Sequence, residues 1–455
     1  MKWLETNRMS LVFVGFMAAM VLGAIGPANG ATITVGPEAG YDFDGIQAGI
    51  DAALDADTVL AAPGEYLITE PITFRGKAIT VKSEAGPDET FIRMGTPSDT
   101  NRGTVVMFEN GETTASVLDG FTITGGRGSW LPSRSAWGGG GILIDASSGT
   151  VRNCTVVENT AEYGAGVGVY FGASATLTNC IIRRNSATIS AGGVQSVFNS
   201  TMTMTYCTIV ANSAGETGGG GVCGGHSSMS MIHCAIVGNT AGKYAGGLFN
   251  DNTPMTLSNC TIWGNSAGQS GGGMTCYDGA SATVTNSIFW DNSAPTGAQI
   301  RLSPGRPAVV TVTYSNVAGG QVGVSVESGS TLNWGPGNID ADPCFADPSN
   351  DDFHLKSQAG RWDPTSQTWV QDDVTSPCID AGDPLSPIGW EPFPNGGFVN
   401  MGAHGGTSEA SQTYFGEPPC ETIVAGDING DGQVNRADLE IMALHWTDDV
   451  PLPLP

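Results

Sequence analysis

The C-terminal end of the sequence has the spacing of a calcium-binding loop. Oxygen-bearing groups occupy positions 1, 3, 5, 7, 9 and 12 of the stretch 427–438, and Gly432 occupies position 6. These groups belong to Asp427, Asn429, Asp431, Gln433 (through its backbone carbonyl), Asn435 and Asp438. Ca²⁺ prefers about six to eight oxygen ligands, which this spacing supplies once Asp438 closes the loop with both carboxylate oxygens. The stretch predicts a Ca²⁺ site followed by a short helix.

A second group could do acid–base chemistry. His226, Asp251 and Asp278 fall near the same place in three consecutive copies of a repeat described below. If copies stack, the two aspartates lie about one stacking distance apart, close to the separation of a retaining glycosidase pair. The alternative is that both aspartates cap ordinary turns, and no base accompanies them. Three further histidines, at 354, 404 and 445, are isolated and lack zinc-ligand spacing, so no transition-metal site is expected.

A third group could bind rather than react. Trp263 and Trp290 stand two residues before equivalent asparagines and alternate with an apolar row, so they should point outward on neighbouring copies. Stacked tryptophans form a platform for sugar rings or a contact for a partner. The alternative is that the C-terminal part of the chain folds back and covers them. Both interpretations remain open from the sequence.

All these residues depend on a repeat whose clearest copies span 137–294. With variations, each copy reads Gly-Gly-Gly-apolar, a variable polar bend, apolar-Thr-Asn-Cys-x-Ile, then Asn-Ser/Thr-Ala. The closing asparagines are spaced 26, 27, 27, 26 and 27 residues apart and are Asn159, Asn185, Asn212, Asn239, Asn265 and Asn292. Five residues before each stands a cysteine or, in the last copy, a serine: Cys154, Cys180, Cys207, Cys234, Cys260 and Ser287. A fixed period of this size predicts a solenoid.

The residue types indicate a parallel β-helix. Leucine is scarce, the apolar runs are short and β-branched, and no copy has room for a helix between its glycines. Three short strands per copy fit, with a bend at the first Asn, and copies would stack about 4.8 Å apart. The cysteines should then form an interior ladder of unpaired small residues, and the asparagines should fill left-handed turns. The predicted fold class is an all-β, right-handed parallel β-helix solenoid.

The N-terminal region supports export. Residues 1–30 have a basic start, an apolar run and a small-x-small cleavage site, which is typical of a secretory signal peptide rather than a membrane anchor. Residues 44–55 predict an amphipathic helix, with Asp44 and Gln47 spaced as a capping box, that covers the open end of the first coil. The β-helix is expected to span 31–339.

These features resemble secreted right-handed β-helix proteins of the pectate-lyase-like superfamily over roughly residues 40–345, and the Gly-Gly and Asn-Ser/Thr-Ala phrases also resemble repeats of bacterial surface adhesins. The resemblance implies a fold rather than an activity, because this fold carries lyases, hydrolases, epimerases and inert adhesins. The acid and base sets of the family's lyases and galacturonan hydrolases are not found in register.

The rest of the chain resembles tails of exported bacterial proteins. Residues 340–411 are expected to cap the β-helix, with Cys344 and Cys378 as the candidate disulfide, and 412–425 to form a linker. Residues 426–449 resemble one half of a dockerin type I module, which implies Ca²⁺ binding and docking to a cohesin-like scaffold or a cell-surface component. A complete dockerin carries two such loops, and this sequence has one.

Composition restricts the partners. The formal net charge is −26, which argues against nucleic acid and anionic membrane surfaces. With its signal peptide removed, the protein is expected to be a secreted monomer without a membrane span. The predicted function is binding, with or without degradation, of extracellular polysaccharide. The alternative is a non-catalytic surface adhesin or stalk.

Overall fold

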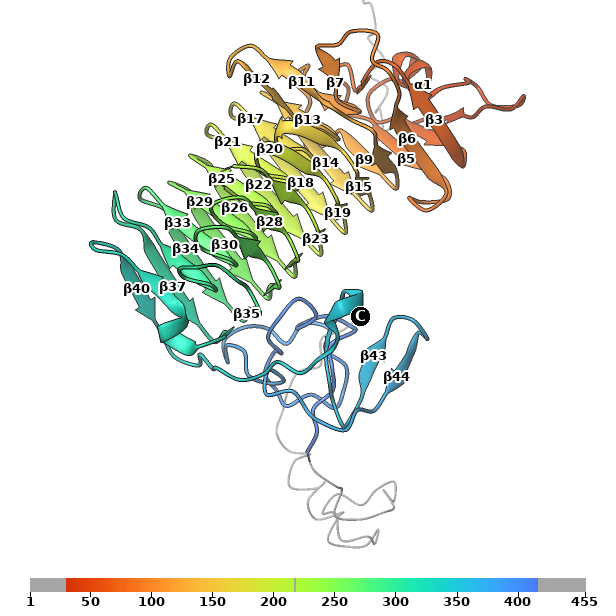
Figure 1. The fold of residues 1–455 in the computed structure, drawn as a ribbon. Coiled ribbons are helices and arrows are strands. Elements are labelled where there is room, and N and C mark those ends of the chain that lie inside the picture. Colours follow the sequence, from red (N-terminus) through yellow and green to blue (C-terminus); the bar gives the residue numbers. More distant parts are fainter. Residues whose placement is uncertain (1–29, 217, 416–455) are drawn as a thin grey trace, which may run out of the picture.

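The protein is a long parallel β-solenoid with an irregular segment packed along its side (Figure 1). This architecture comes from a computed structural model that describes residues 30–216 and 218–415. The main core runs the length of the solenoid and is filled largely by valine, isoleucine, leucine, methionine and cysteine side chains. The predicted right-handed parallel β-helix is confirmed, and the solenoid ends in residues 309–334 as short final coils.

Four sheets run along the solenoid, and we number them I to IV. Sheet I has twelve strands: β1 (Thr32–Val35), β2 (Thr58–Ala61), β5 (Thr80–Ser83), β9 (Val117–Asp119), β14 (Ser148–Arg152), β18 (Ser174–Thr178), β22 (Thr201–Thr205), β26 (Ser228–Ile232), β30 (Pro254–Ser258), β34 (Ser281–Thr285), β37 (Val309–Thr313) and β40 (Thr331–Trp334). Sheet II has ten strands: β3 (Gly64–Ile68), β6 (Thr90–Met94), β10 (Thr122–Thr124), β15 (Thr155–Val157), β19 (Ile181–Arg183), β23 (Thr208–Val210), β27 (Ala235–Val237), β31 (Thr261–Trp263), β35 (Ile288–Trp290) and β38 (Asn316–Val317).

The other two sheets complete each coil. Sheet III has eight strands: β7 (Arg102–Gly103), β11 (Gly128–Leu131), β12 (Ala136–Gly138), β16 (Thr160–Tyr163), β20 (Ser186–Ser190), β24 (Ser213–Ala214), β28 (Thr240–Ala241) and β32 (Ser266–Ala267). Sheet IV has ten: β4 (Ile72–Thr73), β8 (Val106–Phe108), β13 (Ile142–Asp145), β17 (Val167–Tyr170), β21 (Val194–Val197), β25 (Val222–Gly225), β29 (Leu248–Asp251), β33 (Met274–Tyr277), β36 (Ile300–Leu302) and β39 (Val324–Val326). Sheet III adds a fourth short strand to the three expected per coil.

The closing asparagines form a continuous hydrogen-bonded ladder inside the solenoid. The Nδ2 of Asn185 donates to the Oδ1 of Asn212 at 3.0 Å and to the carbonyl of Val156 at 2.9 Å, and the pattern repeats from Asn159 to Asn292. These asparagines are almost fully buried. The expectation that they adopt left-handed turns is wrong, because the left-handed residue is the one before each of them, for example Arg184 or Ala211. A buried amide needs partners for every polar atom, and the ladder supplies them.

The cysteine ladder lies in the core as expected. The five repeat cysteines are buried and unpaired. Each thiol faces the carbonyl two residues earlier; in Cys180 the Sγ lies 3.3 Å from the oxygen of Thr178. Ser287 makes the same contact with its hydroxyl. Small side chains with one weak donor suit this row, because they pack closely and satisfy a carbonyl at each bend.

Helix α1 (Ile46–Ala52) covers the N-terminal end of the core, as predicted. Ile46 and Ile50 are buried against the first coil. The predicted capping box is absent: the N-cap residue is Gly45 and no side chain caps the helix. Gln47 instead bonds both backbone groups of Thr73, at 2.8 and 3.1 Å, which ties the helix to the next coil.

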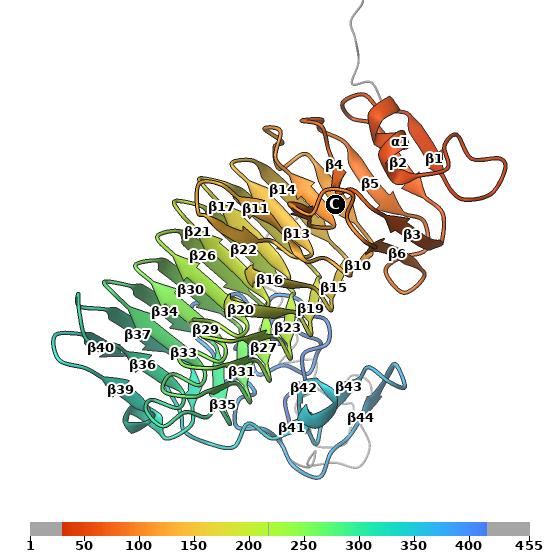
Figure 2. The same ribbon diagram turned by 45° about the horizontal axis from the view of Figure 1, so that its top comes forward.

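Residues 340–415, which we call the C-terminal segment, do not cover the end of the solenoid. They lie alongside sheet II in both views (Figures 1 and 2). Its strands form two antiparallel pairs: β41 (Phe345–Asp347) with β42 (Asp352–Leu355), and β43 (Arg361–Asp363) with β44 (Thr368–Val370). One 3₁₀ turn, η2 (Pro348–Asn350), lies within the segment, and another, η1 (Gly320–Gly323), lies before it. The expected end cap is therefore a side-packed segment, because its apolar residues match the outward face of sheet II.

The proposed Cys344–Cys378 disulfide is wrong. Both cysteines are unpaired. Cys378 is buried, and its Sγ accepts a hydrogen bond from Nδ2 of Asn316 at 3.0 Å. Cys344 sits in a left-handed turn and directs its thiol toward the carbonyl of Asp342. The two thiols are thus engaged with different neighbours.

Candidate functional site

The bend between sheets I and II contains a second row of stacked residues. Asparagine occupies this left-handed position in most clear repeats, as in Asn153 and Asn179, whose side chains bond each other at 2.9 Å. Two neighbouring coils depart from the pattern and carry Tyr206 and His233. Their rings stack with centroids 4.9 Å apart and planes within 5° of each other. The coil spacing therefore produces a flat aromatic step on an otherwise amide-lined corner.

A cavity of about 390 Å³ lies between this step and the C-terminal segment. The solenoid contributes Tyr206, His233 and the start of strands β23 and β27. The C-terminal segment contributes Trp390 and a loop, and the lining residues of that loop are Ala403, His404, Thr407, Ser408 and Glu409. Trp390 is 81% exposed, and Tyr206 is 45% exposed. A cleft with aromatic surface on both walls and polar groups at its base suits a sugar chain better than a compact apolar ligand.

Hydrogen bonds to the solenoid hold this loop in place. The amide of Ala403 donates to Oγ1 of Thr261 at 3.0 Å, and the Nδ2 of Asn259 donates to the carbonyl of Asn400 at 2.9 Å. Within the loop, Thr407 bonds the carbonyl of His404 with its hydroxyl at 2.6 Å. The cleft walls are therefore fixed relative to each other, and the site is preformed.

Burial sets the charge of the groups behind the cleft. It lowers the pKa of His233, against the opposing influence of the backbone at Ala403 and Gly405, so the stacked imidazole is neutral near pH 7. Burial also raises the pKa of Glu391 to about 7, although its Oε1 accepts hydrogen bonds from the amides of Asn400 and Gly406, both at 2.7 Å. The other oxygen of Glu391 is buried without a partner. Both shifts favour the uncharged form of a group at or behind the cleft wall.

Sequence reasoning missed a histidine cluster at the cleft's edge. His354 and His404, fifty residues apart and expected to be isolated, stack with ring centroids 3.6 Å apart, and Glu409 lies beside them. The prediction of isolated histidines is therefore wrong. The fold-back of strand β42 onto the loop at 402–410 brings them together, and no local spacing in the sequence encodes that contact.

Trp263 and Trp290 do not form an open platform. They are neighbours in sheet II as expected, but the C-terminal segment packs over them. Trp263 contacts Phe353 with ring centroids 5.6 Å apart, and both tryptophans border a second apolar core. The sequence left open whether these tryptophans are exposed or covered, and the structure shows that the C-terminal segment covers them. Adjacent aromatic side chains form a large apolar surface, and here that surface packs against an apolar face of the same chain.

The candidate acid–base group lies at another corner, between sheets IV and I. In the neighbouring coils, Asp251 is paired in register with Gly225 and Tyr277. His226 and Asp278 each follow one of these by one position. They therefore align with Asn252 rather than with Asp251. Asp278 forms a two-bonded ion pair with Arg306, at 2.8 and 2.5 Å.

The environments of the two aspartates differ. Burial raises the pKa of Asp251, whereas hydrogen bonds from Arg306 lower the pKa of Asp278. One oxygen of Asp251 is buried without a hydrogen-bond partner. A cavity of about 380 Å³ adjoins this corner and is lined by His226, Asn252 and residues 199–201, 227 and 228.

The Ca²⁺ ligands proposed at Asp427, Asn429, Asp431, Gln433, Asn435 and Asp438 lie outside the described residues, as does the predicted signal peptide. None of the helices in residues 30–415 has the length and apolar character needed to cross a membrane.

The stacked coils and side-packed segment define a parallel β-solenoid protein. The family model of the right-handed β-helix region matches residues 98–240 and 214–338, which together make up more than half of the chain. The protein therefore belongs to the right-handed β-helix family. A second family model, described as disaggregatase related, matches residues 311–382, from the last coils into the C-terminal segment. A comparison with curated protein sequences finds no match.

Solved structures with similarity to this chain include several β-helix enzymes. Pectate lyase Pel9A is 14% identical, with a TM-score of 0.39, over 78% of this chain and 89% of its own. A polygalacturonase from Erwinia carotovora is 13% identical (TM-score 0.36; 68% and 96% covered). Pectin methylesterase from carrot is 12% identical (TM-score 0.33; 70% and 85% covered). At these values the likeness does not carry an argument about activity.

Proposed function

We propose that this protein is a secreted β-helix protein that binds extracellular polysaccharide in the cleft between the solenoid and the C-terminal segment. The observation that carries the proposal is that both parts of the chain contribute aromatic side chains to the cleft: the solenoid the stacked rings of Tyr206 and His233, and the C-terminal segment the exposed indole of Trp390. Aromatic rings bind the apolar faces of sugars, and nearby hydroxyl and carboxylate groups bind their hydroxyls.

The charge of the chain narrows the substrate class. A formal net charge of −26 repels polyanions, so the proposal favours a neutral polysaccharide over a uronate-rich one. The neutral imidazole of His233 adds no positive charge that would reverse this preference.

Binding of the full-length protein to a panel of neutral and acidic polysaccharides tests the proposal. Tyr206→Ala and Trp390→Ala should each weaken binding about tenfold, since stacking contacts of this kind contribute about 1–2 kcal/mol. Tyr41→Ala is the control, because Tyr41 is 38% exposed and lies near the N-terminal end of the solenoid, away from both candidate sites. Equal binding by all three variants would place the binding site elsewhere, and no binding by the wild type would favour the non-catalytic stalk.

Glycoside hydrolysis by Asp251 and Asp278 is the second candidate function. The observation that favours it is the opposite displacement of their two pKa values, which is the arrangement that separates a general acid from an ionised partner. Asp251 would donate the proton, while Asp278, held ionised by Arg306, would stabilise positive charge on the sugar. Release of reducing ends from any polysaccharide bound, abolished by Asp251→Asn with thermal stability unchanged, would support hydrolysis. Unchanged release would exclude this pair.

We also propose that the tail binds Ca²⁺ through residues 427–438 and tethers the protein to a cohesin-like or cell-surface component. The ligand spacing of the loop supports this proposal. Calorimetric titration with Ca²⁺ should give one site that Asp427→Ala and Asp431→Ala remove. A wild-type chain that takes up no Ca²⁺ would contradict it.

A further inference from the structure

His354, His404 and Glu409 converge from two separate parts of the C-terminal segment. His354 lies on β42, and the other two lie on the loop that forms one wall of the cleft. One ligand atom of each residue lies within 4.8 Å of the ligand atoms of the other two. The hydroxyl of Ser411 donates to the carbonyl of Leu355 at 2.5 Å, so the strand and the end of the loop are bonded together beside the cluster.

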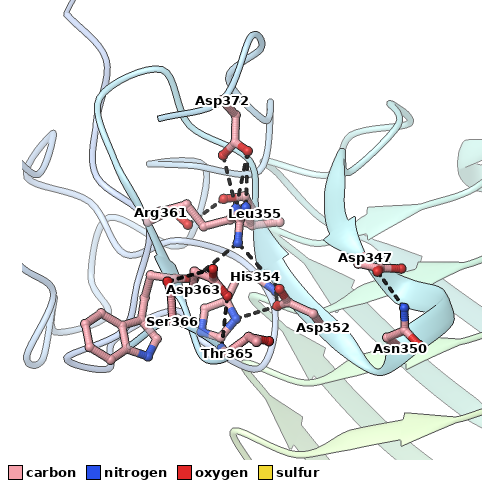
Figure 3. Close-up of polar contacts among 12 residues, drawn as sticks. Asp347, Asn350, Asp352, His354, Leu355, Arg361, Asp363, Thr365, Ser366 and Asp372 are labelled. Atoms are coloured by element: carbon pink, nitrogen blue, oxygen red, sulfur yellow. Dashed lines mark hydrogen bonds and ion pairs between the residues drawn. The ribbon is translucent and has the colours of Figure 1, made fainter. Parts of the chain in front are cut away.

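His354 is oriented by a chain of charged partners. Its Nδ1 lies 2.6 Å from Oδ1 of Asp352, and the other oxygen of Asp352 lies 3.5 Å from Nη1 of Arg361 (Figure 3). Arg361 is in turn held by Asp372 at 3.1 Å. A carboxylate that accepts a hydrogen bond from one ring N–H of an imidazole fixes its tautomer and leaves the other nitrogen with a free electron pair.

That second nitrogen is left without a partner. The side chain of His354 is 3% exposed, and its Nε2 is buried and makes no hydrogen bond. It points to the cluster, where the nearest carboxylate oxygen, Oε2 of Glu409, is 3.5 Å away. A buried lone pair without a donor costs free energy unless a ligand occupies the position.

We propose that His354, His404 and Glu409 bind one divalent transition-metal ion, for which Zn²⁺ is the best match. Two imidazole nitrogens and one carboxylate oxygen are ligands that Zn²⁺ favours, and a three-residue set leaves the fourth position open to water or to a ligand in the cleft. Tetrahedral Zn²⁺ needs ligand atoms about 3.3–3.6 Å apart, a separation that Nε2 of His354 and Oε2 of Glu409 already have at 3.5 Å. Because the rings of His354 and His404 are stacked, metal binding also requires His404 to turn so that its ring nitrogen faces the ion.

The competing interpretation is a proton in place of the metal. His354 would then be an imidazolium held between Asp352 and Glu409. In that case His404 would stack on a cation and make no contact with the proton. In addition, the 3.5 Å separation between Nε2 of His354 and Oε2 of Glu409 is long for a charge-assisted hydrogen bond. A metal ion engages all three residues, so the geometry favours it.

Zn²⁺ titration of the full chain tests this proposal. The protein is stripped with chelator, freed of any histidine tag and held in excess Ca²⁺ to occupy the predicted tail loop. Isothermal titration calorimetry should give one Zn²⁺ equivalent, and Co²⁺ should give the visible absorption of a tetrahedral site. His404→Gln and Glu409→Gln, which spare the buried His354, should each weaken Zn²⁺ binding at least tenfold.

Two controls make the outcome decisive. His226→Gln removes an exposed histidine at the other corner and should leave Zn²⁺ binding unchanged. Glu84→Gln removes an exposed carboxylate and should also have no effect. Absence of Zn²⁺ binding by the wild type would overturn the proposal in favour of the imidazolium. Retention of the Zn²⁺ equivalent by both His404→Gln and Glu409→Gln would overturn it by placing the ion elsewhere in the chain.

Discussion

The rings of Tyr206 and His233 stack in parallel at 4.9 Å, about one coil spacing apart, on the corner where the neighbouring coils carry asparagine. The contact exists because both side chains leave the backbone from the same left-handed bend. Ring overlap creates this surface, because the two ring planes lie within 5° of each other.

The first prediction therefore distinguishes the contribution of the Tyr206 ring to polysaccharide binding from that of its hydroxyl. Tyr206→Phe should bind any polysaccharide ligand within about twofold of the wild type, whereas Tyr206→Ala should bind about tenfold more weakly. The measurement is the Kd from calorimetry for the best polysaccharide in the panel. If Tyr206→Phe loses as much affinity as Tyr206→Ala, the hydroxyl is the contact and the stacking argument fails.

A second prediction concerns the interior asparagine ladder. Asn212→Ala removes the acceptor for the backbone amide and Nδ2 of Asn185 and leaves the carbonyl of Ile182 without its donor. Each buried polar group left unpaired costs about 1–3 kcal/mol, so the variant should lose roughly 3–5 kcal/mol of stability. The midpoint of thermal unfolding should fall by about 5 °C. Asn101→Ala, at an exposed asparagine, is the control and should change it little.

The third prediction distinguishes packing from binding at Trp263. Because this indole contacts Phe353 in the second core, Trp263→Ala should destabilise the protein by about 2–3 kcal/mol and speed proteolytic cleavage within residues 340–415. Trp390→Ala should leave both properties unchanged, since Trp390 is mostly exposed. A Trp263→Ala protein with wild-type stability and weaker glycan binding would restore the open-platform interpretation.

The fourth prediction uses the pH dependence of stability. The carboxyl of Glu391 has a pKa raised by burial from 4.5 to about 7, so folding favours its protonated form. Its contribution is fully present below about pH 4.5, declines as pH rises toward 7, and is absent above that, a loss of about 3 kcal/mol at most.

Glu391→Gln is the matched test of this dependence. Glutamine keeps the oxygen that accepts from Asn400 and Gly406 and removes the ionisation. The variant should therefore gain stability relative to the wild type at pH 8 and not at pH 4.5, as measured by thermal unfolding at both values. Glu84→Gln should show no such difference. Equal shifts of the two variants at pH 8 would contradict the assignment.

The fifth prediction concerns the cysteines. In native protein Cys344, which is partly exposed, should react with an alkylating reagent, although burial raises the pKa of its thiol and slows the reaction. Cys378 and the repeat cysteines should react only after unfolding, because they are buried. Mass spectrometry of peptides prepared without reductant checks this. Recovery of a linked Cys344–Cys378 peptide would restore the disulfide that the sequence suggested.

The sequence by itself determined the solenoid, because every copy of the repeat has nearly the same length, the same strand positions and the same apolar core positions. Cys180 and Ile182 are buried, and the first Asn of most clear copies bends the chain. The reason is local: side chains on a strand alternate between the two faces of the sheet, and stacking repeats the same inward and outward positions in every coil. Tyr206 and His233 also stand out in the sequence, because most other copies have Asn at this position, directly before the repeat cysteine. The sequence does not show that their rings stack.

Only the tertiary structure decided where the unrepeated residues lie. The C-terminal segment could have covered the end of the solenoid or its side, and the apolar match with sheet II decided for the side. That choice covered Trp263, separated Cys344 from Cys378, and placed His354 on His404. Contacts between segments far apart in the chain depend on which surfaces complement each other, and a sequence without a period carries no local record of that pairing.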